Sequence, residues 1–269
     1  MKYKCLSIAG FDGSGGAGLQ ADLKTFSALG CYGMTVLTAL PVQNTCGVRC
    51  CYDIPLQCID DQLHAIFEDI TPDSIKIGML FSTPIIELVA DFLAKHAREI
   101  PIIIDPVMVA KSGDHLLLPE AIDTLRNKLI PLATLLTPNL PEAYALAQQT
   151  EDLDHLAECL LALGPNAVLI KGGHAIGDQC NDLFIDKNGA RCVLEGTKIN
   201  TKNTHGTGCT LSAAICAGIA QGLSTLTACQ HAKRYLFDAI LSAKDNSVGK
   251  GQGPVNHFHH VWQQKERGV

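Results

Sequence analysis

The sequence predicts an α/β sandwich built around a mostly parallel sheet. Short apolar runs that suit strands alternate with longer stretches of helical hydrophobic periodicity along the whole chain. The run Ile102–Ile104 is apolar at every position, as expected of a strand that helices cover on both faces. No Pro-, Ser- or Gly-rich linker and no charge block divides the 269 residues, so we expect a single domain over residues 1–269.

The composition argues against several classes of protein and favours a cytoplasmic one. Hydrophobic residues make up 47% of the chain, which is enough for a sizeable core. The net charge of -6 argues against nucleic acid or an anionic membrane surface as the main partner. No apolar run reaches the roughly 18 residues of a membrane helix. The 12 cysteines include no Cys-x-x-Cys pair, so we interpret them as reduced thiols.

A glycine-rich loop separates the first predicted strand from the first predicted helix. Lys4–Ala9 is predicted as the strand, because its apolar part is too short for a signal peptide. The loop contains a formal Gly-x-Gly-x-x-Gly from Gly13 to Gly18, which in dinucleotide-binding folds is followed by an acidic residue after the second strand. The predicted second strand, Tyr32–Ala39, ends without that acid. A flexible loop that folds around a small substrate fits the glycines equally well.

A proline places the next segment at a sheet edge or in a turn. Pro41 precedes Gln43 and Asn44, whose amides offer paired donors and acceptors. Such amides suit the edge of a heterocyclic substrate. A surface turn explains the same residues, so both interpretations stay open.

The remaining segments alternate between helices and strands. Helices are predicted at Ile59–Ile70 and from Thr83 to Leu93, strands at Ser74–Met79, Ile102–Ile104, Thr134–Leu136 and Ala167–Ile170, a hairpin at 182–194, and one helix from the turn at 205–209 to about Ala243. The polar stretch 110–114 is a candidate flap. The histidines of 257–260 could bind a metal, but a surface tail is the favoured interpretation, because no cysteines accompany them.

Polar side chains follow several of these strands. Asp105 and Lys171 come directly after two strands, and Asn139 and Glu142 follow a third. Open α/β sheets bind ligands at the carboxyl ends of their strands, so these groups are candidates for one site. Mg²⁺ needs only one or two carboxylates besides phosphate oxygens and water, and phosphoryl transfer needs such an ion together with a phosphate clamp. Helix capping by Asp105 and Asn139, with Glu142 in solvent, is the alternative.

The turn His205-Gly206-Thr207-Gly208-Cys209 lies at the start of a predicted helix with a buried face. Free backbone N–H groups and the positive end of the helix dipole make such a start an anion site. Gly206 and Gly208 allow the backbone to approach the anion closely, and Thr207 adds a hydroxyl. A plain glycine-rich helix start is the alternative.

In their order and spacing these pieces resemble the ribokinase-like small-molecule kinases, and within them the hydroxymethylpyrimidine/phosphomethylpyrimidine kinases of thiamine biosynthesis. The matching motifs are Ile8-Ala9-Gly10, Asp12, Ser14 to Lys24, Gln43-Asn44-Thr45, Lys76 to Leu80, Asp105 to Met108, Lys111-Ser112-Gly113, Thr137 to Ala143, Lys171 to His174, His205 to Cys209, and Gly253 to Phe258. The resemblance covers nearly the whole chain. It implies a ribokinase-like three-layer α/β/α sandwich with a mostly parallel central sheet, and ATP-dependent phosphorylation of 4-amino-5-hydroxymethyl-2-methylpyrimidine and then of its monophosphate.

The resemblance also implies roles for individual residues. Substrate contacts are implied for Ala17, Asp22, Gln43, Met79 and Val107; nucleotide contacts for Lys171, Asn139, Thr207 and Lys233; Mg²⁺ ligation for Glu142 and Asp105; and stabilisation of the transferred phosphoryl group for Gly206, Thr207 and Gly208. The implied partners are the small pyrimidine alcohol, ATP and a second copy of the chain, with part of segment 30–55 near the partner. Neither nucleic acid nor membrane is implied.

Cys209 distinguishes the resemblance to the pyrimidine kinases from a general resemblance to ribokinase-like enzymes. Most ribokinase-like enzymes carry an aspartate base at this turn, whereas the pyrimidine kinases carry cysteine. A helix N-terminus is expected to lower the pKa of a thiol from its usual value of roughly 8.5. We therefore hypothesise that Cys209 accepts the proton of the substrate hydroxymethyl group.

Two departures from the family pattern concern substrate preference. Phe11 and Gly13 stand where small or proline residues are usual, and Pro41-Val42 precede Gln43 where Thr/Val-Ala is expected. Phe11 could narrow the pocket or stack on the substrate ring. Pyridoxal or pyridoxine kinase is therefore the alternative function, although Gln43 and Met79 favour the pyrimidine. A non-catalytic binding protein is disfavoured, because the groups for the cation, the phosphates and the hydroxyl are all present.

Overall fold

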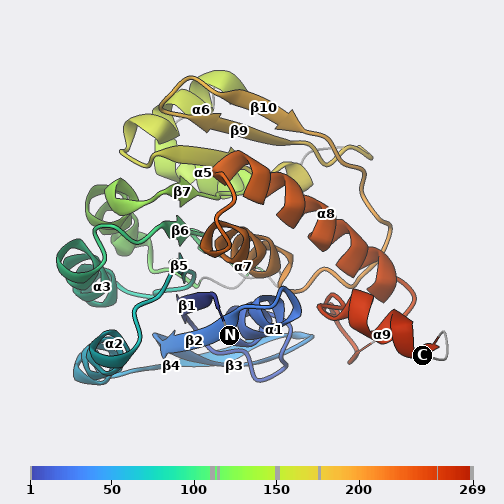
Figure 1. The fold of residues 1–269 in the computed structure, drawn as a ribbon, viewed down its shortest axis with the longest axis horizontal. Helices are drawn as coiled ribbons and strands as arrows, with labels where there is room; N and C mark the ends of the chain where they lie inside the picture. The colour runs from blue at the N-terminus through green and yellow to red at the C-terminus, as the bar shows by residue number, and fades with distance from the viewer. Residues whose placement is uncertain are drawn as a thin grey trace.

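An eight-stranded sheet forms the centre of the protein in a computed structural model, which describes residues 2–109, 113, 116–148, 152–174, 177–246 and 248–266 (Figure 1). The strands lie in the order β10-β9-β8-β7-β6-β5-β1-β2. Their bounds are β1 Lys4–Ala9, β2 Tyr32–Leu37, β5 Ser74–Ile77, β6 Ile102–Ile104, β7 Leu135–Leu136, β8 Ala167–Ile170, β9 Asp182–Asp186 and β10 Arg191–Leu194. The six neighbouring strands from β2 through β1 to β8 run parallel to one another. Strand β9 runs antiparallel to both of its neighbours, β8 and β10. The predicted mostly parallel sheet and the terminal hairpin are confirmed.

Helices cover both faces of this sheet and complete the three-layer sandwich (Figure 1). One apolar core lies between the sheet and α2, α3, α5 and α6, and a second lies between the sheet and α1, α7 and α8. The helices are α1 Gly18–Ala28, α2 Leu56–Asp69, α3 Thr83–His96, α4 Ile122–Thr124, α5 Leu140–Ala147, α6 Leu153–Ala162, α7 Thr207–Ala220, α8 Thr225–Ala243 and α9 His259–Glu266, with short irregular turns η1 Pro119–Ala121, η2 Leu125–Leu129, η3 Ile130–Leu132 and η4 Gly172–His174. Within the described ranges, no helix has both the length and the apolar composition needed to cross a bilayer.

The central strand β6 shows why its sequence is apolar without interruption. Side chains alternate between the two faces of a strand, so neighbours point in opposite directions. Ile102 and Ile104 belong to the core beneath α3, whereas Ile103 belongs to the core beneath α7. All three side chains are buried, as predicted for a strand covered on both faces.

The segment after β2 leaves the main sheet. Among the residues that the structure describes, strands β3 (Ala39–Asn44) and β4 (Gly47–Asp53) pair only with each other, as an antiparallel hairpin. The predicted strand Tyr32–Ala39 therefore ends two residues early, at Leu37. Both strands of a two-stranded sheet are edges, so the interpretation of Pro41 as an edge residue is confirmed.

The single long helix predicted from the turn at 205–209 to Ala243 is wrong: the structure contains two helices. Helix α7 ends at Ala220, and Gly222 adopts a left-handed conformation with φ +92° before α8 begins. Glycine adopts this conformation readily, and it ends a helix. The small side chains of α7 then let α8 pack closely: a Cβ at Gly218 would lie 3.1 Å from the Cβ of Ala228.

The interpretation of the C-terminal histidines as a surface tail is also wrong. His257 and His259 are buried against α7 and α8, where Thr210 Oγ1 lies 3.1 Å from His257 Nε2 and the Tyr235 hydroxyl donates to the His257 carbonyl. Burial lowers the pKa of His257 to about 4, so the ring is neutral at physiological pH. Within the described ranges, no group of three or more His, Cys, Asp or Glu side chains is arranged to hold a metal ion. Of the candidate flap at 110–114, only residue 113 lies among the described residues.

Alanine substitutions in β6 test the two-core arrangement. Ile103→Ala and Ile104→Ala should each lower the free energy of unfolding by about 2–5 kcal/mol, because each leaves a cavity in a different core. Val193→Ala on β10, where the side chain is 51% exposed, is the matched control and should cost less than about 0.5 kcal/mol. Urea denaturation followed by circular dichroism measures all three. Loss of stability in only one isoleucine variant would contradict burial of both faces.

Candidate active site

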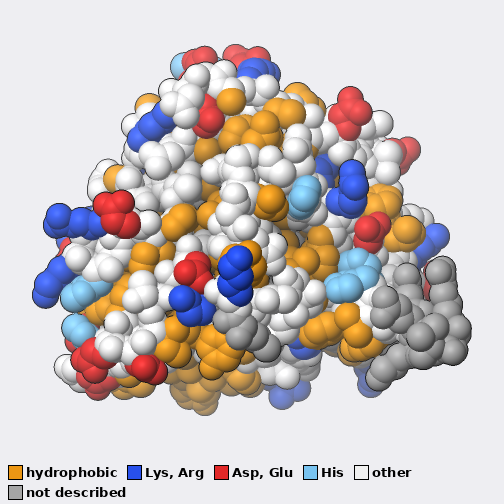
Figure 2. Space-filling model, viewed as in Figure 1, with side chains coloured by type: hydrophobic (Ala, Val, Ile, Leu, Met, Phe, Trp, Pro, Cys, Tyr) orange, Lys and Arg blue, Asp and Glu red, His pale blue; other side chains and the backbone are white. Residues whose placement is uncertain are grey.

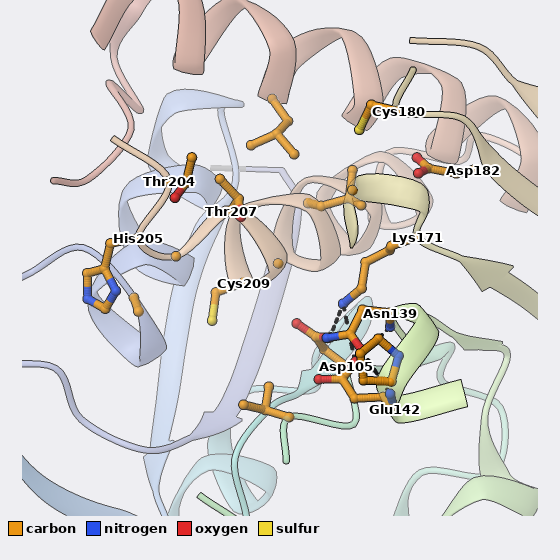
Figure 3. Close-up of a pocket in the computed structure, with 18 of the residues that line it drawn as sticks. Asp105, Asn139, Glu142, Lys171, Cys180, Asp182, Thr204, His205, Thr207 and Cys209 are labelled. Carbon is orange, nitrogen blue, oxygen red and sulfur yellow. Dashed lines mark hydrogen bonds and ion pairs between the residues drawn. The ribbon is translucent and has the colours of Figure 1, made fainter. Parts of the chain in front are cut away.

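A cavity of about 1530 Å³ lies where the central strands end and α7 begins. Loops after β6, β7 and β8 form one wall, the first residues of α7 form another, and the first loop, the β3–β4 hairpin and α8 complete it (Figure 3). All but one of the residues assigned from the sequence line this cavity: Ala17, Gln43, Met79, Asp105, Val107, Asn139, Glu142, Lys171, Gly206, Thr207, Gly208, Cys209 and Lys233. The parallel direction of the strands explains the convergence, because their carboxyl ends meet at one edge of the sheet.

An acid–lysine cluster forms the strand-end wall (Figure 3). Lys171 Nζ donates to Asp105 Oδ1 at 2.7 Å and lies 3.8 Å from Glu142 Oε2. Burial and the nearby charge of Asp105 together raise the pKa of Glu142 to about 7. The charge of Lys171 offsets only part of this increase. Burial acts to lower the pKa of Lys171, but the two carboxylates outweigh it and raise that pKa. The cluster thus holds two acidic groups and one firmly charged ammonium side by side.

The local sequence Asn-Leu-Pro-Glu fixes the position of Glu142. The Asn139 side chain accepts from Glu142 N at 2.9 Å, and Glu142 Oε2 accepts from Asn139 N at 2.8 Å. This reciprocal pair is a capping box, and a proline in the first turn suits the start of α5. Capping by Asn139, the alternative considered from the sequence, therefore occurs. It places Glu142 in the cavity wall instead of in solvent.

The turn before α7 contributes Gly206, Thr207 and Gly208 to the lining of the cavity. Gly206 has φ +75°, and a Cβ there would lie 1.8 Å from the carbonyl oxygen of Gly16. A Cβ at Gly208 would lie 3.3 Å from Asp105 Oδ2 and 3.5 Å from Lys171 Nζ. The close approach to the first loop therefore requires glycine at position 206, whereas a Cβ at Gly208 would meet only side-chain ends of the acid–lysine cluster. The turn and the cluster face the same space across the cavity.

The prediction that the helix N-terminus lowers the pKa of Cys209 is wrong. Burial, together with the charges of Asp22 and Asp105, raises the pKa of this thiol to about 11. Lys76 and a hydrogen bond from the Gly18 backbone act in the opposite direction but do not outweigh burial. In the ligand-free protein the thiol is therefore protonated at neutral pH.

The first loop and the hairpin form the opposite end of the cavity. Gln43 donates from Nε2 to the Phe11 carbonyl at 3.2 Å, and both residues line the wall with Ala17. Met79 and Val107 add apolar surface to the same wall. Phe11, whose role was open from the sequence, is thus held next to Gln43.

Asp22 is the assigned residue that does not reach the cavity. Its side chain is fully buried behind the wall, where it accepts from Lys76 Nζ at 2.8 Å and from Ser7 Oγ at 2.5 Å. Substrate contact by Asp22 is therefore not supported by its position. Lys76 lines the cavity in its place. Burial acts to lower the Lys76 pKa, yet Asp22 and the neighbouring acidic groups raise it.

Lys233 lies at the far end, between α8 and the β9–β10 hairpin. It donates to Asp182 Oδ2 at 2.7 Å and to the Cys180 carbonyl at 2.6 Å. A Cβ at Gly196 would lie 2.9 Å from the Lys233 Cε. The lysine therefore fixes the hairpin to α8 and adds its aliphatic stem to the cavity.

Sequence reasoning missed four polar residues of this region. Lys76 begins a matched motif and Ser212 lies three residues after another, and neither was given a role; Ser212 Oγ donates to Asp105 Oδ2 at 3.3 Å. Asp12 and His205 meet at 2.8 Å beside the turn. The signal for Asp12 was its place immediately before the glycine loop, whose free N–H groups need an acceptor.

A cavity at the strand ends that combines the start of α7, an acid–lysine cluster and an end lined by Gln43 and Phe11 is that of a ribokinase-like small-molecule kinase. The chain belongs to the phosphomethylpyrimidine kinase family, whose sequence model matches residues 12–256. A relative from Salmonella typhimurium, named hydroxymethylpyrimidine/phosphomethylpyrimidine kinase, is 48% identical over 97% of this chain and 99% of that protein.

Two solved structures share the fold. The ADP complex of Bacillus subtilis pyridoxal kinase has a TM-score of 0.88 at 38% identity and covers 97% of this chain and 99% of its own. Phosphomethylpyrimidine kinase from Clostridium difficile has a TM-score of 0.78 at 43% identity and covers 89% of this chain and 100% of its own. The predicted fold class and family are confirmed.

Two glycine substitutions at the ends of α7 distinguish the effect of backbone strain on kcat from the effect of displacing the turn before α7. Gly206→Ala and Gly222→Ala each force a residue with a Cβ into a left-handed conformation, at about 1–2 kcal/mol. Only Gly206→Ala also displaces the Gly16 carbonyl, so only it should lower kcat for phosphoryl transfer, by about 10²-fold or more. Nothing lies within 4 Å of a Cβ built at Gly222. Equal kcat values in the two variants would show that the turn does not act on the reaction.

Proposed function

We propose that this protein uses ATP to phosphorylate 4-amino-5-hydroxymethyl-2-methylpyrimidine, and then its monophosphate, to give the diphosphate used in thiamine synthesis. The observation that carries the proposal is a single cavity with Gln43 and Phe11 at one end and the acid–lysine cluster and the α7 turn at the other. The relative named for both phosphorylation steps supports it, since nearly the whole of each chain is covered. One kinase domain over residues 1–269 is part of the proposal.

The acceptor alcohol is assigned to the end formed by the first loop and the hairpin. The Gln43 amide would read a ring nitrogen and an exocyclic amino group, because one amide offers both a donor and an acceptor. The Ala17 backbone, Met79 and Val107 would enclose the ring. Burial of the apolar ring and a few placed polar groups is the usual composition of a small-molecule site.

The nucleotide is assigned to the other end. Lys171, Asn139 and Thr207 would contact its phosphates, and the stem of Lys233 would border the rest of the nucleotide, close to the β9–β10 hairpin. The related structure from Bacillus subtilis is described as an ADP complex, which supports a nucleotide in a cavity of this fold. The N–H groups at Gly206, Thr207 and Gly208 would stabilise charge that develops on the transferred phosphoryl group.

The donor set fits Mg²⁺. Asp105 and Glu142 put two hard carboxylates on one cavity wall, and the raised pKa of Glu142 indicates acidic groups that a cation would relieve. Two protein carboxylates suffice, because Mg²⁺ in kinases takes its other ligands from phosphates and water. When bound, the ion would neutralise phosphate charge. Lys171 is placed to share that task and to hold Asp105 in position.

A homodimer and a cytoplasmic location complete the proposal. The hairpin outside the main sheet exposes Val42 and Tyr52, the latter 61% exposed. Hydrophobic side chains gather along the lower edge of the molecule, over β2, β3 and β4 (Figure 2). Such a surface suits a second copy of the chain, and a monomeric mass by light scattering would contradict the proposed homodimer.

The structure forms no disulfide among the cysteines that it describes, which supports a reducing compartment.

Pyridoxal kinase activity is the second candidate, because a protein of that name shares 38% identity and a TM-score of 0.88 with this chain. ADP release should be measured separately with the pyrimidine alcohol, its monophosphate and pyridoxal. We expect release with the first two and kcat/KM at least about tenfold lower with pyridoxal, since a site built to hydrogen-bond one ring rejects another that leaves those groups unpaired. Gln43→Ala should reduce the ratio between kcat/KM for the pyrimidine alcohol and kcat/KM for pyridoxal. The reverse preference would favour pyridoxal kinase, and no release with any acceptor would leave a binding protein.

Substitution of Cys209 tests the base. A general base contributes typically 10²–10⁴-fold, so Cys209→Ala should lower kcat by at least about 10²-fold. The thiol has a pKa of about 11 and must lose its proton to act, so the thiolate fraction and kcat/KM should rise from pH 6.5 to pH 9. Cys209→Asp supplies a base already ionised in this range and should give a flatter profile. If Cys209→Ala keeps most of kcat, positioning alone dominates.

A further inference from the structure

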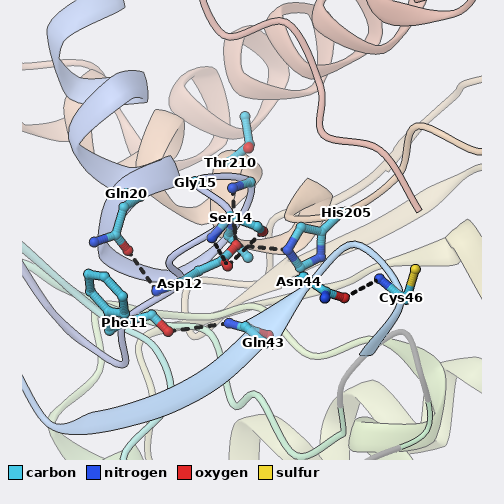
Figure 4. A network of polar contacts seen from close by, with 12 residues as sticks. Phe11, Asp12, Ser14, Gly15, Gln20, Gln43, Asn44, Cys46, His205 and Thr210 are labelled. Atoms are coloured by element: carbon cyan, nitrogen blue, oxygen red, sulfur yellow. Dashed lines mark hydrogen bonds and ion pairs between the residues drawn. The ribbon is translucent and has the colours of Figure 1, made fainter. Parts of the chain in front are cut away.

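The carboxylate of Asp12 is the centre of a hydrogen-bond network at the acceptor end of the cavity (Figure 4). Oδ1 accepts from the backbone N–H of Ser14 at 2.9 Å and from its hydroxyl at 2.7 Å. Oδ2 accepts from Gly16 N at 3.0 Å and Ala17 N at 2.7 Å. The side chain is 0% exposed. One buried carboxylate therefore shapes the loop whose Ala17 backbone lines the cavity.

The fifth contact of this carboxylate comes from the other side of the site. His205 Nε2 lies 2.8 Å from Asp12 Oδ2. Since an ionised carboxylate can only accept, Nε2 carries the hydrogen and donates it. His205 directly precedes the Gly206–Cys209 turn. Through this hydrogen bond, the charged side chain of Asp12 joins the first loop to the turn that starts α7.

Close packing accompanies this hydrogen bond. A Cβ at Gly16 would lie 2.4 Å from His205 Cδ2, and one at Gly206 would lie 1.8 Å from Gly16 O. The histidine backbone is held from behind, because His205 N donates to the Gly253 carbonyl at 3.0 Å. The same C-terminal segment reaches the hairpin, where Gln252 N donates to the Thr45 carbonyl at 2.8 Å. Loop, turn and hairpin therefore form one connected unit.

The charge state supports a permanent pair. Burial by itself would raise the pKa of Asp12, but hydrogen bonds from His205, Ser14 and Ala17 lower it to about 2. The carboxylate is consequently ionised throughout the physiological range. All five of its contacts are N–H or O–H donors, as a buried carboxylate requires.

We propose that Asp12 and His205 are a positioning pair that holds the acceptor hydroxyl in line with the phosphoryl-binding turn. The inference rests on the proposed function. The acceptor is bound by the loop that Asp12 shapes, and the transferred group by the turn that His205 begins. A misplacement of about 1 Å between reacting groups costs about 10²-fold in rate. Neither side chain takes part in the chemistry itself.

Two substitutions of similar size separate this role from a general need for histidine. His205→Gln places an amide N–H where Nε2 lies and keeps the bond to Asp12, whereas the shorter His205→Asn cannot reach it. His205→Asn should lower kcat about 10²-fold, and His205→Gln should restore it to within about fivefold of the unaltered enzyme. The dissociation constant of ATP, measured by titration without acceptor, should change less than about threefold in both. A merely structural role would change the folded fraction and ATP binding together.

A double-variant cycle tests whether the two residues act as a unit. If they do, the combined variant should lower kcat no further than Asp12→Asn alone, because that substitution already breaks the pair along with the contacts of Asp12 in the loop. His64 and Asp60, whose side chains approach to 3.7 Å on the surface of α2, form the matched control. His64→Asn and His64→Gln should leave kcat unchanged.

Three results would overturn the inference: kcat of His205→Asn within threefold of the unaltered enzyme, equal losses in the Asn and Gln variants, or factors that multiply in the combined variant. If His205→Asn does not fold, His205→Ala with added imidazole replaces it. Imidazole should then raise kcat, and no rise would overturn the inference. An unaltered enzyme that releases no ADP with any acceptor would instead overturn the proposed function, and this inference with it.

Discussion

The contact between two glycine backbones, Gly16 and Gly206, is the constraint on which the site depends. The first follows β1 and the second begins α7, and side chains at either position would drive the two segments apart. Their approach joins the loop to which we assign the acceptor and the turn to which we assign the phosphates. A Cβ at Gly206 would lie 1.8 Å from the Gly16 carbonyl oxygen, so only glycine allows the two backbones to meet in this way.

Much of the fold could be predicted, because hydrophobic periodicity records which faces are covered. The apolar run at Ile102–Ile104 correctly indicated a doubly covered strand. The errors have physical causes. The periodicity of α7 and α8 is continuous across Gly222, so a break that depends on one left-handed residue was not visible. The β3–β4 hairpin has ordinary strand composition, and its departure from the main sheet is decided by tertiary packing. His257 and His259 are polar in type, and their burial depends on partners in α7 and α8.

The site was predictable where it follows from strand direction. Asp105, Asn139 and Lys171 each follow a strand, and parallel strands bring such residues together without further information. Pairings across the chain were not predictable in this way. Asp12 and His205 are separated by 193 positions, and nothing in either local sequence indicates the other. Asp22 shows the opposite error: a residue within a matching motif was given a substrate contact, although its partner is the buried Lys76 behind the wall.

The raised pKa of Cys209 explains what a cysteine offers at this turn. Asp105 and Glu142 already place two acidic groups across the cavity, and Asp22 lies buried behind its wall. An ionised aspartate at position 209 would add a further negative charge in front of the N–H groups that attract phosphate. A thiol with a pKa of about 11 is neutral before substrates bind, so it adds no negative charge to the turn to which we assign the phosphates. The lysines Lys76 and Lys171 then determine how easily the thiol proton can be lost. With Cys209 as the proposed base, this position would exchange the strength of a ready base for better capture of phosphate.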